Sequence, residues 1–145
     1  MSSVKIGVKR LHPDAKLPKY AHNGDACADV YCLHGAIIPP GYAQEFKTGL
    51  AFEIPEGWMI EVRPRSGLSC RSRLIIPNSP GTIDHEYTGE FLVHLHNIGQ
   101  VIQEIPEGSR ICQIRPVPVD TFDFYETEEL SETTRGTGGF GSTGK

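Results

Sequence analysis

Apolar and polar residues alternate with a period of two in several short runs along the chain. The alternation is clearest at residues 4–9 and 58–63, and it is the pattern of a strand with one buried face. Further strand-like runs lie at 42–47, 50–54, 91–96, 101–105 and 110–117. Many short strands of this kind predict an all-β fold, an antiparallel sandwich or barrel.

Proline and glycine separate these runs. The turns Pro55-Glu56-Gly57 and Pro106-Glu107-Gly108 are nearly identical; proline presets φ, and glycine accepts a positive φ. Eleven prolines and sixteen glycines leave little room for long helices. Only residues 66–72, which follow Pro64, are predicted to form a short helix.

The C-terminal segment has a different character. From Glu126 the apolar periodicity stops, and five of the last ten residues are glycine. Such a segment has few side chains to bury and much backbone entropy to lose. We therefore expect residues 1–125 to form a β-barrel domain and residues 126–145, the C-terminal tail, to be mobile.

Composition limits the function classes. The chain has 145 residues, 38% apolar and 22% charged, with a net charge of −4, which is ordinary for a single soluble domain. It has no apolar run of membrane-spanning length and no apolar secretory leader at its N-terminus. A pI near 5.8 argues against a protein that coats nucleic acid. We expect a cytoplasmic protein without a nucleic-acid or membrane partner.

The four cysteines do not indicate a metal site. They are scattered without a C-x-x-C pair, so the spacing predicts neither a zinc ribbon nor a redox motif. We expect them to be reduced and buried.

The tail contains two patterns associated with phosphate binding. Residues 136–141 fit G-x-G-x-x-G, and residues 139–145 fit the start of a Walker A loop. Both motifs require a helix after the glycines, and the sequence has none there. The tail could still contribute glycine amides and the Arg135 guanidinium to a phosphate, and the flat face of Phe140 to a base.

Two internal segments carry further candidate chemistry. Arg65-Ser66-Gly67 lies in the first turn of the predicted helix, where anions bind well; a helix cap with a surface arginine is the alternative. In residues 81–89, Asp84 could activate a water and Tyr87 could pack on a sugar, although an acidic turn would look the same. His94 and His96 share a strand face, but no third metal ligand is evident, which favours a solvated face.

Taken together, five segments resemble the homotrimeric deoxyuridine triphosphate nucleotidohydrolases (dUTPases) in content and order. They are residues 28–31, 65–68, 81–89, 108–113 and 135–144. The resemblance implies a jelly-roll-like distorted β-barrel and a homotrimer with shared active sites. It also implies hydrolysis of dUTP to dUMP and pyrophosphate by attack of water on the α-phosphate. This reaction keeps uracil out of DNA and supplies dUMP for thymidylate synthesis.

The resemblance also implies roles for individual residues. Asp84 would be the catalytic base, and Asp29 would support the phosphate network. Uracil and deoxyribose would contact Asn78, Gly81, Thr82, Ile83, Tyr87 and Phe140. The phosphates would contact Arg65, Ser66, Gly67, Gln113, Arg135, Gly141, Ser142 and Thr143. Mg²⁺ would be held by the triphosphate and water, with no direct protein ligand.

Some alternatives stay open at this point. A dCTP deaminase would share the fold but needs a catalytic glutamate near the base and Arg-Ser-Ser in place of Arg65-Ser66-Gly67. A nucleotide-sensing module could keep the fold without turnover. The chain departs from the family pattern at Thr88 and Ser109, which affects fine affinity rather than the reaction. A viral protein would act in the host cytoplasm or nucleus.

Overall fold

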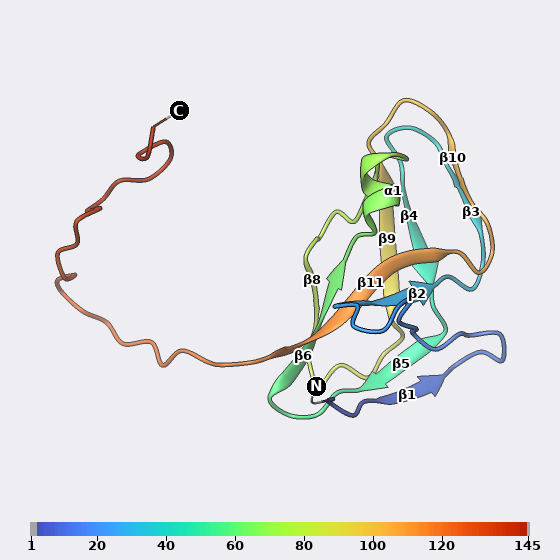
Figure 1. Cartoon of the computed structure of the whole chain (residues 1–145), viewed down its shortest axis with the longest axis horizontal. Coiled ribbons are helices and arrows are strands. Elements are labelled where there is room, and N and C mark those ends of the chain that lie inside the picture. Colours follow the sequence, from blue (N-terminus) through green and yellow to red (C-terminus); the bar gives the residue numbers. More distant parts are fainter. Residues whose placement is uncertain (1–2, 145) are drawn as a thin grey trace.

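The computed structural model describes residues 3–144, which form antiparallel strands and one short helix (Figure 1). The all-β prediction is confirmed. The elements are β1 (Gly7–Arg10), β2 (Ala28–Tyr31), β3 (Ala36–Ile38), β4 (Ala43–Lys47), β5 (Leu50–Glu53), β6 (Trp58–Arg63), α1 (Ser66–Cys70), β7 (Leu74–Ile75), β8 (Gly81–Ile83), β9 (Leu92–Asn97), β10 (Gln103–Ile105) and β11 (Arg110–Pro118).

The strands form several small antiparallel sheets around one core rather than a closed ring. The largest sheet has the order β2-β11-β6-β8, and a second has the order β4-β9-β7. Two further pairs, β1 with β5 and β10 with β3, complete a jelly-roll-like body. The core receives fully buried side chains from five strands: Val30, Ile38, Leu50, Leu95 and Ile111.

Partners explain where the observed strands differ from the predicted ones. The strand predicted at 4–9 begins only at Gly7, because its partner β5 ends opposite at Glu53. The strand predicted at 101–105 begins at Gln103, whose partner Ile38 is the last residue of β3, before two prolines. The helix is also shorter than predicted and ends at Cys70, where the amides of Arg71 and Ser72 close the last turn on the Gly67 carbonyl.

Beyond β11 the chain leaves the body. Residues 119–144 contain no helix or strand, and Figure 1 shows them extending away from the sheets. Five large apolar side chains of this segment are more than 80% exposed: Phe122, Phe124, Tyr125, Leu130 and Phe140. The division at residue 125 into a barrel and a lid stays a prediction.

Within residues 3–144, no helix has the length and apolar character needed to cross a membrane.

Asn97, at the end of β9, joins the end of β3 to the loop between β9 and β10 from inside the core. Its side chain is fully buried and donates to the carbonyl oxygens of Ile38 (2.9 Å) and Val101 (2.8 Å). Its side-chain oxygen accepts from the Gly99 amide at 2.9 Å. One side chain therefore satisfies three backbone groups that have limited access to water.

We expect Asn97→Ala to lower the free energy of unfolding by about 2–4 kcal/mol, because it leaves buried backbone groups unpaired. Urea unfolding followed by circular dichroism measures the change. Asn23→Ala, at an exposed position, is the matched control and should change stability by less than about 0.5 kcal/mol. Equal stability of the two variants would contradict this role of Asn97.

Candidate active site

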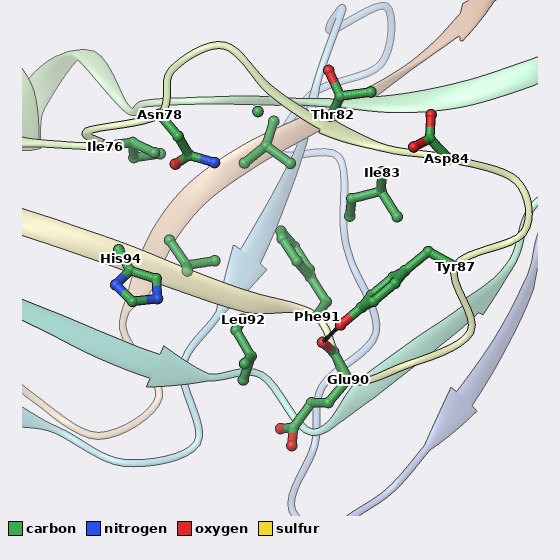
Figure 2. A pocket seen from close by; sticks show the side chains of 13 residues that line it. Ile76, Asn78, Thr82, Ile83, Asp84, Tyr87, Glu90, Phe91, Leu92 and His94 are labelled. Atoms are coloured by element: carbon green, nitrogen blue, oxygen red, sulfur yellow. Dashed lines mark hydrogen bonds between the residues drawn. The ribbon is translucent and has the colours of Figure 1, made fainter.

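Six of the predicted site residues line one cavity of about 240 Å³ between β8 and β9 (Figure 2). They are Asn78, Gly81, Thr82, Ile83, Asp84 and Tyr87. Here β8 pairs with β6, with Gly81 opposite Val62, and both residues line the cavity. A Cβ atom on Gly81 would come within 3.0 Å of the Val62 Cβ, so only glycine fits there without a shift.

Asp84 and Tyr87 belong to one tight turn at the rim of this cavity. Asp84 directly follows β8 and is exposed, and its carbonyl accepts from the Tyr87 amide at 3.1 Å. The Tyr87 hydroxyl donates to the Glu90 carbonyl at 2.8 Å, as Figure 2 shows. A carboxylate and an aromatic ring therefore belong to one short, closed loop that lines the cavity.

A second cluster surrounds Asp29, which is only 5% exposed on β2. Arg65 Nε lies 3.3 Å from its Oδ1, and one terminal guanidinium nitrogen of Arg110 lies 3.6 Å from its Oδ2. Gln113 Nε2 donates to Oδ1 at 3.3 Å. Arg65 Nε has no well-aligned acceptor, so charge rather than a directional hydrogen bond holds it beside the carboxylate.

This cluster opens into a second hollow of about 380 Å³, lined also by His22, Asp25 and Cys27. Two arginines against one buried carboxylate favour an anionic ligand. The motif at 108–113 contains Arg110, but its pairing with Asp29 was not predicted. That pairing follows from the register of β11 on β2, which is irregular between Arg110 and Cys112.

The remaining predicted residues lie outside both cavities. Ser66 and Gly67 begin α1, directly after Arg65. The tail residues Gly141, Ser142 and Thr143 are exposed, and Phe140 is fully exposed. Arg135 Nε donates to the nearby Gly138 carbonyl at 2.8 Å. A single chain thus does not bring its own tail to its own cavity.

The histidine pair is a solvated strand face. His94 Nε2 lies 3.1 Å from Glu45 Oε2, with both side chains about half exposed, and His96 Nε2 lies 3.3 Å from the Gly41 carbonyl. Within residues 3–144, no three His, Cys, Asp or Glu side chains come together as a metal site.

The prediction that all four cysteines are buried is wrong in part. All four are free thiols; Cys32 and Cys112 are buried, Cys27 is half-buried and Cys70 is exposed. Burial raises the pKa of the Cys112 thiol, and the nearby Asp29 charge raises it further. Burial also raises the pKa of Cys32, and backbone hydrogen bonds oppose the shift. Cys70 is the last residue of α1, a short helix in which no residue is buried.

Comparison with known proteins identifies the family. The dUTPase family model matches residues 13–144. The chain belongs to the dUTPase family. A deoxyuridine 5′-triphosphate nucleotidohydrolase from Picosynechococcus sp. is 46% identical over 93% of this chain and 95% of its own length. One from Clostridium tetani is 41% identical over the full length of both chains.

A solved structure supports the same assignment. The Staphylococcus bacteriophage 80alpha dUTPase G164S mutant, solved with dUpNHpp, superimposes with a TM-score of 0.89 and 27% identity. The match covers 99% of this chain and 100% of that one. The predicted family resemblance is confirmed.

As a member of the dUTPase family, the chain is a dUTP diphosphatase. It hydrolyses dUTP to dUMP and pyrophosphate by attack of water on the α-phosphate, which keeps uracil out of DNA and supplies dUMP for thymidylate synthesis. This activity decides against the deaminase and the inactive nucleotide sensor.

We expect the four thiols to differ sharply in reactivity, because the thiolate is the reacting form and burial suppresses it. At a pH near 8, a thiol reagent should label Cys70 first, whereas Cys32 and Cys112 should react only after unfolding. Peptide mapping after timed labelling measures the order, and Cys70→Ser should remove the fastest phase. Rapid labelling of Cys112 in the folded enzyme would contradict its burial.

Proposed function

We propose that the β8–β9 cavity binds the deoxyuridine part of dUTP and that Asp84 is the catalytic base. The observation that carries this proposal is the meeting of Asn78, Asp84 and Tyr87 around one cavity. Asp84 accepts a proton from a water as the water oxygen forms a bond to the α-phosphorus. The bond from this phosphorus to the bridging oxygen then breaks, and pyrophosphate leaves.

Base selection falls to the segment from Asn78 to Ile83. Backbone groups of Gly81, Thr82 and Ile83, with the Asn78 amide, pair with the polar edge of uracil. Cytosine presents a donor where uracil presents an acceptor, and such a buried mismatch costs about 1–3 kcal/mol. The same segment leaves no space for the 5-methyl group of thymine.

The Asp29 cluster is proposed to bind the phosphates. Arg65, Ser66, Gly67 and Gln113 contact the α-phosphate region, and Asp29 orients the Arg65 guanidinium and the Gln113 amide. The geometry supports this role, because both side chains lie within 3.3 Å of the buried carboxylate. A fixed guanidinium binds phosphate at a lower entropic cost than a free one.

Mg²⁺ is proposed to accompany the triphosphate rather than to occupy a protein cage. The only carboxylate in the phosphate cluster that is buried, Asp29, already faces two arginines. This environment suits a metal that keeps its waters and phosphate oxygens as ligands. The bound ion would offset negative charge on the leaving pyrophosphate.

We propose a homotrimer in which each site is shared between subunits. Asp29 and Asp84 belong to opposite edges of the sheet β2-β11-β6-β8, and the two cavities have no lining residue in common. The exposed aromatic segment that includes Phe122 and Phe124 also needs a partner surface. A neighbouring subunit supplies that surface and brings one chain's phosphate cluster beside another chain's cavity.

In this arrangement the C-terminal tail, residues 126–145, is a lid that reaches a neighbour's cavity. Phe140 covers the uracil ring, and four further residues close on the β- and γ-phosphates: Arg135, Gly141, Ser142 and Thr143. Ordering a glycine-rich segment is entropically costly, so closure needs the complete triphosphate to stabilise it. The cytoplasmic location stays a prediction.

We expect Asp84→Asn to preserve nucleotide affinity and to slow the chemical step by about 10²–10⁴-fold, because the amide cannot accept the proton. Single-turnover pyrophosphate release measures the step, and binding of a non-cleavable dUTP analogue measures affinity. The control is Glu86→Gln, which makes the same change from carboxylate to carboxamide at an exposed position of the same loop. Unchanged single-turnover hydrolysis by Asp84→Asn would assign the base elsewhere.

Removal of residues 135–145 is expected to leave the fold intact but to reduce turnover at least about a hundredfold, because the lid donors are lost. Circular dichroism tests whether the fold is intact, and steady-state assays of dUTP hydrolysis measure the loss of turnover. Mixing this truncated chain with Asp84→Asn chains should restore activity. A complete site then takes Asp84 from a truncated chain and the tail from an Asp84→Asn chain, which happens at about a quarter of the sites in randomly mixed trimers. No recovery after verified subunit exchange would contradict the sharing of Asp84 and the tail between subunits.

A further inference from the structure

The ring of Tyr87 is held in place by Gly89 and Glu90, two residues that have no proposed role in the chemical step. The side chain is 47% exposed, so packing alone leaves the ring considerable freedom. Its hydroxyl, however, donates to the Glu90 carbonyl oxygen at 2.8 Å (Figure 2). This hydrogen bond fixes the far end of the ring, while the turn at Asp84 fixes the near end.

Gly89 provides the space in which this hydrogen bond forms. A Cβ atom at this position would lie 2.8 Å from the Tyr87 hydroxyl oxygen and 2.9 Å from Cζ. Gly89 does not have a positive φ of the kind that favours glycine. The glycine is therefore needed for the close approach of the ring to the backbone and not for an unusual conformation.

Glu90 connects this arrangement to the core. Its carboxylate Oε2 accepts from the Gly49 amide at 3.0 Å. Gly49 is buried, and a Cβ atom there would come within 2.9 Å of both Ala15 and Leu33. The carboxylate is thus bonded to backbone that has little room to move.

The next residue, Phe91, holds the other side of Glu90. Its amide donates to the Leu50 carbonyl at 2.7 Å, and its carbonyl accepts from the buried Thr48 hydroxyl at 2.7 Å. The carbonyl of Glu90 that meets Tyr87 therefore lies between two anchored points.

We propose that Gly89 and Glu90 are positioning residues that hold the Tyr87 ring against the sugar and thereby set the preference for deoxyribose over ribose. This inference rests on the proposed role of Tyr87. A ring held at both ends cannot move aside for a 2′-hydroxyl, whereas a loosely held ring can do so at little cost. Selectivity between dUTP and UTP then depends on how firmly the ring is held. The rate of the chemical step does not depend on it.

The test compares kcat/KM for dUTP and UTP. Glu90→Ala should lower the dUTP-to-UTP ratio about five- to tenfold, the effect of losing one hydrogen bond of ordinary strength. Glu90→Gln should largely restore the ratio, because its side-chain oxygen can still accept from the Gly49 amide. The loss for dUTP should fall on KM, with kcat nearly unchanged.

Two further variants act on the ring itself. Tyr87→Phe removes the hydroxyl and should lower the ratio to a similar extent. The double variant Tyr87→Phe/Glu90→Ala should lower it little further, because both changes release the same contact. Gly89→Ala should shift the ratio in the same direction by displacing the ring. Glu86→Ala, a nearby exposed glutamate, is the control and should leave the ratio unchanged.

Tyr87→Ala separates this inference from the role on which it rests. If it leaves the dUTP-to-UTP ratio unchanged, the proposed contact between Tyr87 and the sugar is wrong. If it lowers the ratio while Glu90→Ala and Gly89→Ala do not, only the positioning inference is overturned. It is also overturned if Glu90→Ala slows both substrates equally or if Glu90→Gln fails to restore selectivity. Melting temperatures verify that each variant is folded during the assay.

Discussion

The central sheet places residues of both cavities, and the pairing of β6 with β11 and β8 joins its two halves. β6 pairs with β11 from Arg63–Gln113 to Trp58–Pro118, and with β8 on its other edge. Since β11 also pairs with β2, Gln113 lies opposite Asp29 as well. A one-residue slip in β6 would turn its own side chains, including Val62 of the first cavity, to the opposite face. Register, rather than any single contact, therefore assembles both cavities.

We infer that the buried charge of the Asp29 cluster serves ligand binding more than stability. A buried ion pair seldom repays the cost of removing both charges from water. Here one carboxylate faces two guanidinium groups, and the Arg65 Nε is not well aligned with it. The excess positive charge and unused donors are suited to a phosphate. We infer that the arrangement is maintained for the complex with substrate, in which the remaining donors find acceptors.

Sequence patterns predicted the long strands well and the short ones poorly. β6 and β11 have six and nine residues, enough for alternation to be recognised. β7 and β8 have two and three, too few for a period of two, and tertiary pairing alone defines them. The family motifs indicated Asp29 and Arg65 separately, but not that they meet, because their contact depends on register. The hydrogen bond from the Gly49 amide to the Glu90 carboxylate could not be predicted from the sequence. Its donor is a backbone group 41 residues away, and a backbone group adds no recognisable pattern to the sequence.

We infer that the enzyme divides specificity and closure between parts with different physical properties. The loop carrying Asp84 and Tyr87 is bonded to backbone packed in the core, so it can discriminate by shape, which requires that it not yield to a slightly larger ligand. Residues 126–144 of the tail make no strand or helix, and Phe140 is fully exposed, so the tail would be ordered by contacts that the substrate and a neighbouring subunit supply. A nucleotide lacking the outer phosphates would fill the cavity but leave the tail open. In the proposed mechanism, binding energy from the distant phosphates would serve to complete the site around the α-phosphorus, where it raises the rate of reaction instead of merely tightening binding.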